Sequence, residues 1–135
     1  MPKMIFVNLP VTGLDRSISF YRALGAEQNM QFSDATAAMM SFSSEISVML
    51  LTHDKYRQFT PKPIADAHAS SQVLLCLSAE GRDDVDAMVA RAAEAGGVAD
   101  PSPTQDYGFM YGRSFEDPDG HHWEVMWMDP SAIQS

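Results

Sequence analysis

The chain repeats one order of elements twice, and this repeat constrains its fold more than any other feature. Each half opens with a strand-like apolar run, at residues 4–11 and 72–79, and continues with a helical pattern that ends at Gly25 or Gly96. Three further strand-like runs complete each half, at about 26–32, 36–43 and 46–53 in the first and about 97–104, 108–116 and 121–128 in the second. We infer an internal duplication of half the chain, visible in element order rather than in residue identity.

Apolar spacing supports the two helices. Apolar residues recur at helical intervals in both, as Leu14, Ile18, Tyr21 and Leu24 and as Val85, Met88, Val89 and Ala92. Thr12 and Asp15 resemble a capping box for the first helix. Asp83 and Asp84 lie near the start of the second, where the helix dipole favours acidic groups.

A proline-containing segment separates the halves. Pro61 and Pro63 exclude a regular central strand within residues 54–71. We interpret this segment as a connector and leave open whether it also acts as a lid. The 135 residues suit one domain, with module 1 at about 1–54, a connecting loop at 55–70 and module 2 at about 71–130.

Composition and charge exclude several classes of protein. The net charge is −9, and its whole acidic excess lies in the second half, so there is no basic stripe for nucleic acid. No apolar run approaches the roughly 20 residues that span a bilayer. The single cysteine, Cys76, excludes an internal disulfide and a multi-cysteine zinc site. With no signal sequence recognisable, we expect a cytoplasmic protein that binds neither nucleic acid nor membranes.

A strong turn sets the phase of the last strand. Asp117-Pro118-Asp119-Gly120 has proline and glycine where a tight turn needs them. In the strand that follows, Trp123 and Val125 share one face, and His122, Glu124, Met126 and Met128 share the other. The tryptophan face is the apolar one and should pack on the helices. The residues alone leave open whether the Glu124 face lines a site or meets ordinary solvent.

Two segments combine into a specific pattern: VTGLDRSISFYRALG at residues 11–25 and EDPDGHHWEVMW at residues 116–127. Together they resemble the glyoxalase/bleomycin resistance protein/extradiol dioxygenase superfamily, also called the vicinal oxygen chelate superfamily. The resemblance covers the duplicated order as well. It implies an α+β fold in which two βαβββ modules form an eight-stranded incomplete barrel with a concave cup. Homodimers are common in this superfamily, so we expect a homodimer.

The resemblance also implies four metal-ligand positions, from the first and last strand of each module. They fall here on Phe6, Leu50, Gln72 and Glu124. Two of these side chains are hydrocarbon, and a divalent cation needs three or more hard donors. We therefore expect no cofactor and no metal; the fallback ligands for a divalent metal are Gln72 and Glu124. His121 and His122 should point to opposite sides of their strand, so they cannot form a regular pair of ligands.

The expected cup has Glu124 as its tentative catalytic residue. Its other candidate ligand-binding residues are Phe6, Asn8, Leu50, Gln72, Ser114, His122 and Met126. Matching the last two strands of the family places Ser114, Gly112 and Met110 on the cup side and Arg113 on the opposite side; a bulge at the glycines would reverse this, so the face of Arg113 stays open. Cys76 shares a strand face with Gln72; a buried inert thiol is the favoured interpretation and a place in the cup is the alternative.

Two functions remain open at this point. The first is a binding protein that holds a small, partly apolar molecule in the cup without a catalytic metal, with Glu124 available to pair with an amine. The second is an enzyme, a lyase, isomerase or dioxygenase, that uses Glu124 as a general base or a metal ligand. Both rest on Glu124, so the residues do not separate them.

Overall fold

The computed structural model describes residues 2–132, and the chain divides into two compact units between Asp66 and Ala67. The division falls inside the predicted connector. Each unit is described by itself below as the first or the second module. In the part of the chain that the structure describes, no helix is long and apolar enough to cross a membrane.

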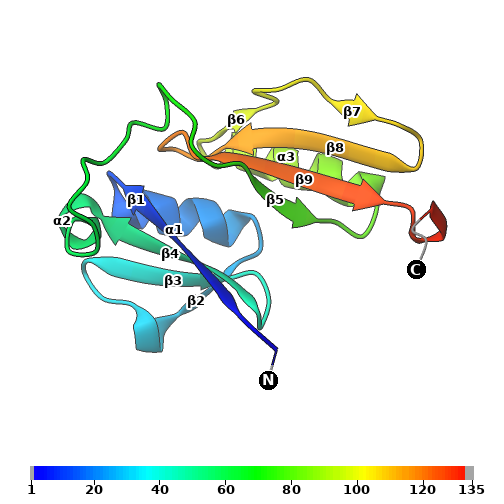
Figure 1. Ribbon diagram of the computed structural model, residues 1–135. Coiled ribbons are helices and arrows are strands. Elements are labelled where there is room, and N and C mark those ends of the chain that lie inside the picture. The colour runs from blue at the N-terminus through cyan, green and yellow to red at the C-terminus, as the bar shows by residue number, and fades with distance from the viewer. Residues whose placement is uncertain (1, 133–135) are drawn as a thin grey trace. The chain divides into compact units, whose positions relative to one another are not determined.

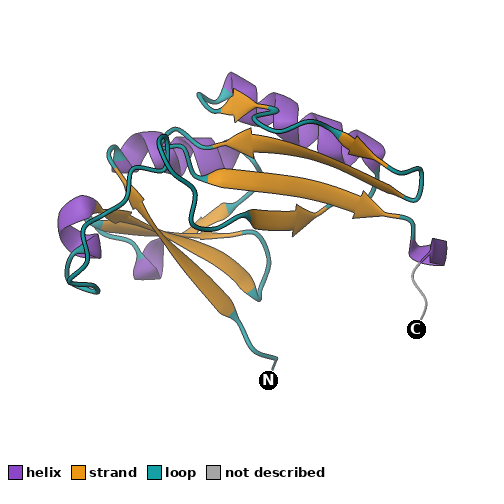
Figure 2. Ribbon diagram, turned by 45° about the horizontal axis from the view of Figure 1, so that its top comes forward, coloured by secondary structure: helices purple, strands orange, loops and turns teal. Residues whose placement is uncertain are grey.

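The first module is a four-stranded sheet with one long helix on a face (Figures 1 and 2). Its elements are β1 (Ile5–Val11), α1 (Leu14–Ala23), β2 (Glu27–Asn29), the short 3₁₀ helix η1 (Met30–Phe32), β3 (Ala37–Ser41), β4 (Ile46–Thr52) and α2 (His53–Tyr56). The strand order is β1-β4-β3-β2, with β1 parallel to β4 and the other pairs antiparallel.

The second module repeats this plan (Figure 1). Its elements are β5 (Leu75–Ser78), α3 (Arg82–Glu94), β6 (Val98–Ala99), β7 (Gln105–Asp106), β8 (Met110–Glu116), β9 (His122–Met128) and the 3₁₀ helix η2 (Pro130–Ala132). The strand order is β5-β9-β8-β6, and β5 is parallel to β9. The predicted α+β class and both βαβββ modules are confirmed.

Two details differ from the prediction. The strand expected at 97–104 is split into β6 and β7, which both pair with β8, so the described residues contain nine strands instead of eight. Asp100 interrupts it with a positive φ of 53°. The strands of the described residues form two sheets and no closed barrel, which agrees with the predicted incomplete barrel. The connector begins with α2, whose first turn is capped by the Thr52 hydroxyl, which accepts a hydrogen bond from the Lys55 amide.

The first helix begins without the predicted capping box. Its N-cap is Gly13, which makes no side-chain cap hydrogen bond. The Thr12 hydroxyl instead accepts a hydrogen bond from the Arg16 guanidinium at 2.9 Å. The predicted helix stops are confirmed, because Gly25 and Gly96 adopt φ values of 100° and 102°, which favour glycine.

Each helix covers one face of its sheet (Figure 2). Phe20 and Tyr21 of α1 are completely buried. In the second module, α3 buries Val85, Val89 and Ala92, and the face of β9 that carries Trp123 and Val125 is buried as predicted. Trp123 stacks on Phe115 of β8, with ring centroids 6.3 Å apart and planes 6° apart.

Candidate functional site: the open face of the second sheet

The turn before β9 is held rigidly. The buried Asp117 carboxylate accepts hydrogen bonds from the amides of Asp119 and His121, at 3.0 and 2.9 Å. Gly120 has a φ of 88°, and a Cβ there would lie 2.7 Å from the amide nitrogen of His68. No other residue fits this position without moving the chain, so the turn fixes which face each residue of β9 presents.

Glu124 lies in the middle of a row that crosses three strands. It pairs in register with Cys76 of β5 on one side and with Ser114 of β8 on the other. Partners in register share a face of the sheet. This face is opposite the one that packs on α3, because Glu124 alternates with the buried Trp123 and Val125.

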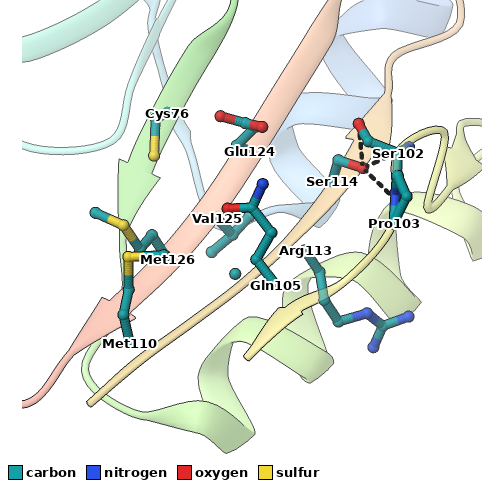
Figure 3. A pocket seen from close by; sticks show the side chains of 11 residues that line it. Cys76, Ser102, Pro103, Gln105, Met110, Arg113, Ser114, Glu124, Val125 and Met126 are labelled. Carbon is teal, nitrogen blue, oxygen red and sulfur yellow. Dashed lines mark hydrogen bonds between the residues drawn. The ribbon is translucent and has the colours of Figure 1, made fainter. Parts of the chain in front are cut away.

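A hollow lies over this row and the next one (Figure 3). Its empty volume is about 340 Å³ and includes space open to solvent. The residues that line it come from β5, β8, β9 and the β6–β7 segment: Cys76, Ser102, Pro103, Gln105, Met110, Gly112, Arg113, Ser114, Glu124, Val125 and Met126. All of these residues belong to the second module.

One side of the hollow is polar and internally bonded. Ser114 is buried, and its hydroxyl accepts a hydrogen bond from the Ser102 amide at 3.1 Å. The Ser102 hydroxyl lies 3.4 Å from Nε2 of His122. These bonds tie the β6–β7 segment to the sheet and leave the Glu124 carboxylate outside the network.

Glu124 is half-buried, and its carboxylate makes no hydrogen bond or ion pair with the described residues of its own module. Its charge acts instead on the neighbouring thiol. Partial loss of solvent around the thiol, and then the Glu124 charge, raise the pKa of Cys76 above its usual value, while part of the side chain stays accessible to solvent. The favoured interpretation of Cys76 as a buried thiol is wrong, because its side chain is exposed at the hollow.

Three of the predicted site residues meet in the hollow: Glu124, Ser114 and Met126. His122 lies at its polar side, bonded to Ser102, but is not a lining residue. Gln72 is not in the site. It lies in an exposed segment before β5, which begins three residues later than predicted, so Cys76 takes the place beside Glu124.

The candidates in the first module lie on two different faces. Phe6 and Asn8 share the face of the sheet opposite Leu50, and both are exposed. Leu50 pairs with Leu9 on the opposite face and is completely buried, so its assignment to the cup is wrong. The strand phase is one residue off from the expected one, and Met49, the partner of Asn8, occupies the open face instead.

The sequence did not indicate Ser102, Pro103 and Gln105 as lining residues. The signal that could have found them is the pair of prolines at 101 and 103, which do not suit a continuous central strand. The break between β6 and β7 lets this segment turn over the edge of the hollow.

Arg113 faces α3, the first of the two alternatives that the sequence left open, and contributes no free charge to the hollow. Its guanidinium donates to Asp86 at 2.9 Å and to Asp100 at 2.7 Å. The hydrogen bond from Arg113 lowers the pKa of Asp100. Hydrogen bonds from Tyr111 and then Arg113 lower the pKa of Asp86. Glu124 is therefore the charged side chain of the hollow that is left available for a ligand.

The donor set does not fit a divalent cation. Of the four positions that the resemblance implies, Phe6 and Leu50 offer no lone pair, and Gln72 does not lie beside Glu124. Among residues 2–132, no three His, Cys, Asp or Glu side chains gather closely enough to hold a metal ion. One carboxylate with a neighbouring protonated thiol is a weak ligand set for a hard cation.

The family is shown by a sequence model that matches residues 3–125. This model describes the Glyoxalase/Bleomycin resistance protein/Dioxygenase superfamily, and the chain belongs to that superfamily. Among curated protein sequences, none matches the chain.

Solved structures show the same fold. Hypothetical protein SA1046 from S. aureus is 27% identical, with a TM-score of 0.78 over 94% of both chains. A lactoylglutathione lyase from Agrobacterium tumefaciens is 18% identical, with a TM-score of 0.68 over 99% of this chain and 100% of that one. The fosfomycin resistance protein FosX from Listeria monocytogenes is 15% identical, with a TM-score of 0.68 over 100% and 95%.

Proposed function

We propose that this protein binds a small, partly apolar molecule in the hollow of the second module and pairs a cationic group of that molecule with Glu124. The observation that carries the proposal is the Glu124 carboxylate, which lines the hollow and has no partner in its own module. The carboxylate oxygens reach solvent, because no buried side-chain oxygen among the described residues lacks a partner, and they are therefore accessible to a ligand. A ligand amine would give this carboxylate a charge-assisted hydrogen bond.

The remaining lining supports a partly apolar ligand. Met110 and Met126 offer flexible, polarizable thioethers, which adapt to varied apolar surfaces. Ser114 is already bonded to the β6–β7 segment, which leaves Glu124 as the group that selects by charge. The net charge of −9 also favours the approach of a cation over that of an anion.

Replacing Glu124 by Gln tests the proposal, because it keeps size and removes the charge. A thermal-shift screen of small amines, neutral isosteres and carboxylates would first find a ligand for the parent. We expect Glu124→Gln to lower the affinity of an amine hit at least tenfold, about 1.4 kcal/mol, without a change in melting temperature. Glu94→Gln, at an exposed position of α3, is the matched control and should bind like the parent. Equal affinity of the parent and Glu124→Gln would refute the proposal.

A second proposal is catalysis with Glu124 as a general base. It is favoured by the same free carboxylate, which could accept a proton from a carbon acid bound over the methionines. Two similar folds belong to a lactoylglutathione lyase and to a fosfomycin resistance protein. Turnover of a bound hit that disappears in Glu124→Gln, while binding of the hit persists, would separate catalysis from simple binding.

We also propose that the protein is a homodimer. The strands β1 and β5 end their sheets, and unpaired strand edges are usually covered in native proteins. Ile5 and Phe6 of β1 are exposed apolar side chains that a partner could cover. Light scattering across a range of concentrations tests this; a constant mass near the 14.9 kDa of one chain would refute it.

A further inference from the structure

Gly112 has no structural reason to be glycine. It lies in the middle of β8 in register with Met126, and its φ is not in the positive range that favours glycine. A Cβ there would meet a single neighbouring atom, the carbonyl oxygen of Val125, at 3.6 Å, which is an ordinary contact. Gly120 is the opposite case, since it is required by both conformation and space.

A glycine inside a strand weakens the strand, and it often marks a place where a ligand approaches the backbone closely. Gly112 lines the hollow and is flanked in register by Gln105 of β7 and Met126 of β9. The missing side chain therefore leaves a bare peptide as the floor between these two residues.

The surroundings of this floor suit a flat apolar group. Met110 precedes Gly112 by two residues on the same face, and Figure 3 shows its thioether beside that of Met126. Thioethers make favourable contacts with aromatic rings, and an exposed peptide plane is a flat surface on which a ring can stack. A bulky, non-planar group is too thick for the shallow space that the absent side chain of Gly112 leaves.

The Glu124 carboxylate lies one row of residues away from the exposed Gly112 backbone. The row of Gly112 and Met126 and the row of Ser114 and Glu124 are two residues apart along the strands, which is about 7 Å. An amine joined to a ring by a short alkyl chain spans such a step. The floor and the carboxylate together therefore match one class of compound.

We propose that Gly112 is a specificity-determining residue, the floor on which the aromatic ring of an arylalkylamine stacks while its ammonium group pairs with Glu124. This inference rests on the proposed binding function and adds the class of ligand to it.

The experiment compares three probes in the full-length protein by isothermal titration calorimetry. They are 2-phenylethylamine, 2-cyclohexylethylamine, which replaces the planar ring, and 3-phenylpropionate, which replaces the amine. We expect the parent to bind 2-phenylethylamine at least fivefold more tightly than either analogue. Gly112→Val should weaken 2-phenylethylamine at least tenfold, and Gly112→Ala should weaken it less, because a larger side chain fills more of the floor.

Melting temperatures without ligand accompany each titration. Both Gly112 variants should melt at or above the temperature of the parent, since a strand favours side chains over glycine. If Gly112→Val does not fold, the affinity of Gly112→Ala for 2-phenylethylamine tests the role of Gly112. Gly81→Ala is the matched control: Gly81 lies outside the hollow, in extended backbone with a φ of −172°, and a Cβ there would meet no atom within 4 Å. It should bind like the parent.

The outcomes separate this inference from the function on which it rests. If Gly112→Val binds 2-phenylethylamine as well as the parent while Glu124→Gln does not, the role of Gly112 is wrong and the binding function stands. The same conclusion follows if the parent binds another amine through Glu124 but not 2-phenylethylamine. If no probe or screened amine binds in a Glu124-dependent way, both proposals fail.

Discussion

The two modules share a strand order and differ in the face that each sheet turns away from its helix. In the first sheet, one row across this face reads Asn8, Met49 and Met39. In the second sheet, a corresponding row reads Cys76, Glu124 and Ser114. The duplicated backbone thus carries an amide and two thioethers in one copy and a thiol, a carboxylate and a hydroxyl in the other. The topology tolerates both, because residues on this face are not needed to pack the helix.

The helix contacts also differ between the modules. α1 is held by the completely buried rings of Phe20 and Tyr21. α3 buries smaller side chains and adds an ionic contact, since its Asp86 binds the guanidinium of Arg113 on β8. Apolar packing does not depend on pH and ion pairs do, so the two modules should respond differently to acid.

The largest expected effect tests the two faces of the first sheet. Leu50→Ala should lower the free energy of unfolding by about 3 kcal/mol, because it empties a completely buried position. Met49→Ala, on the neighbouring half-buried position, should cost about 1 kcal/mol. Urea denaturation of both variants measures the difference. A milder effect at Leu50 than at Met49 would reverse the assignment of the faces.

The turn of the second module gives the next effect. Gly120→Ala combines a positive φ with a Cβ 2.7 Å from the His68 amide, and we expect it to lower stability by about 3 kcal/mol. Gly25→Ala and Gly96→Ala carry the positive φ alone, with no atom within 4 Å, and should each cost about 1 kcal/mol. Chemical denaturation measures all three. Unequal costs at Gly25 and Gly96 would show that the duplicated helix stops are not equivalent.

A smaller effect is expected from the ion pairs of Arg113. Arg113→Met keeps the length of the side chain and should cost about 1 kcal/mol at neutral pH, since the pairs are partly solvated. Arg57→Met, which breaks an exposed pair with Asp54 in the first module, is the control and should change little.

The same pairs predict a dependence on acid. The pKa values of Asp86 and Asp100 are lowered in the folded protein; that of Asp106 is lowered to about 2 by a hydrogen bond from Arg82, which Arg113→Met leaves in place. A lowered pKa means that the stabilisation is present above the unfolded value of about 3.9 and is lost as the pH falls toward 2. The melting temperature, measured between pH 5 and pH 2, should therefore fall less steeply for Arg113→Met than for the parent. An equal fall in both proteins would contradict a contribution of the Arg113 ion pairs to acid sensitivity.

The smallest effect concerns the reactivity of Cys76. Its raised pKa keeps the thiol protonated at neutral pH, so alkylation by iodoacetamide should be slow. Glu124→Gln removes one of the two causes and should speed alkylation several-fold at pH 8, while Glu94→Gln should not. Mass spectrometry at timed intervals measures the rate. An unchanged alkylation rate in Glu124→Gln would show that the Glu124 charge does not control the reactivity of Cys76.

The amino-acid sequence by itself determined the order of elements and the phase of β9. Apolar periodicity, the helix stops at Gly25 and Gly96 and the turn at Asp117–Gly120 act within a few residues of the chain, so they can be recognised without the fold. The placement of Glu124 and Met126 on one face followed from this phase, the family resemblance added Ser114 to that face, and the register agrees with both.

Only the tertiary structure decided which strands lie beside one another and where each begins. Strand phase alternates every residue, so a shift of one position moved Leu50 to the opposite face. A late start of β5 removed Gln72 from the site and placed Cys76 beside Glu124. The segment with Ser102 and Gln105 reaches the hollow through pairing with β8, which joins residues distant in the sequence. Such pairing depends on long-range packing, which local patterns do not encode.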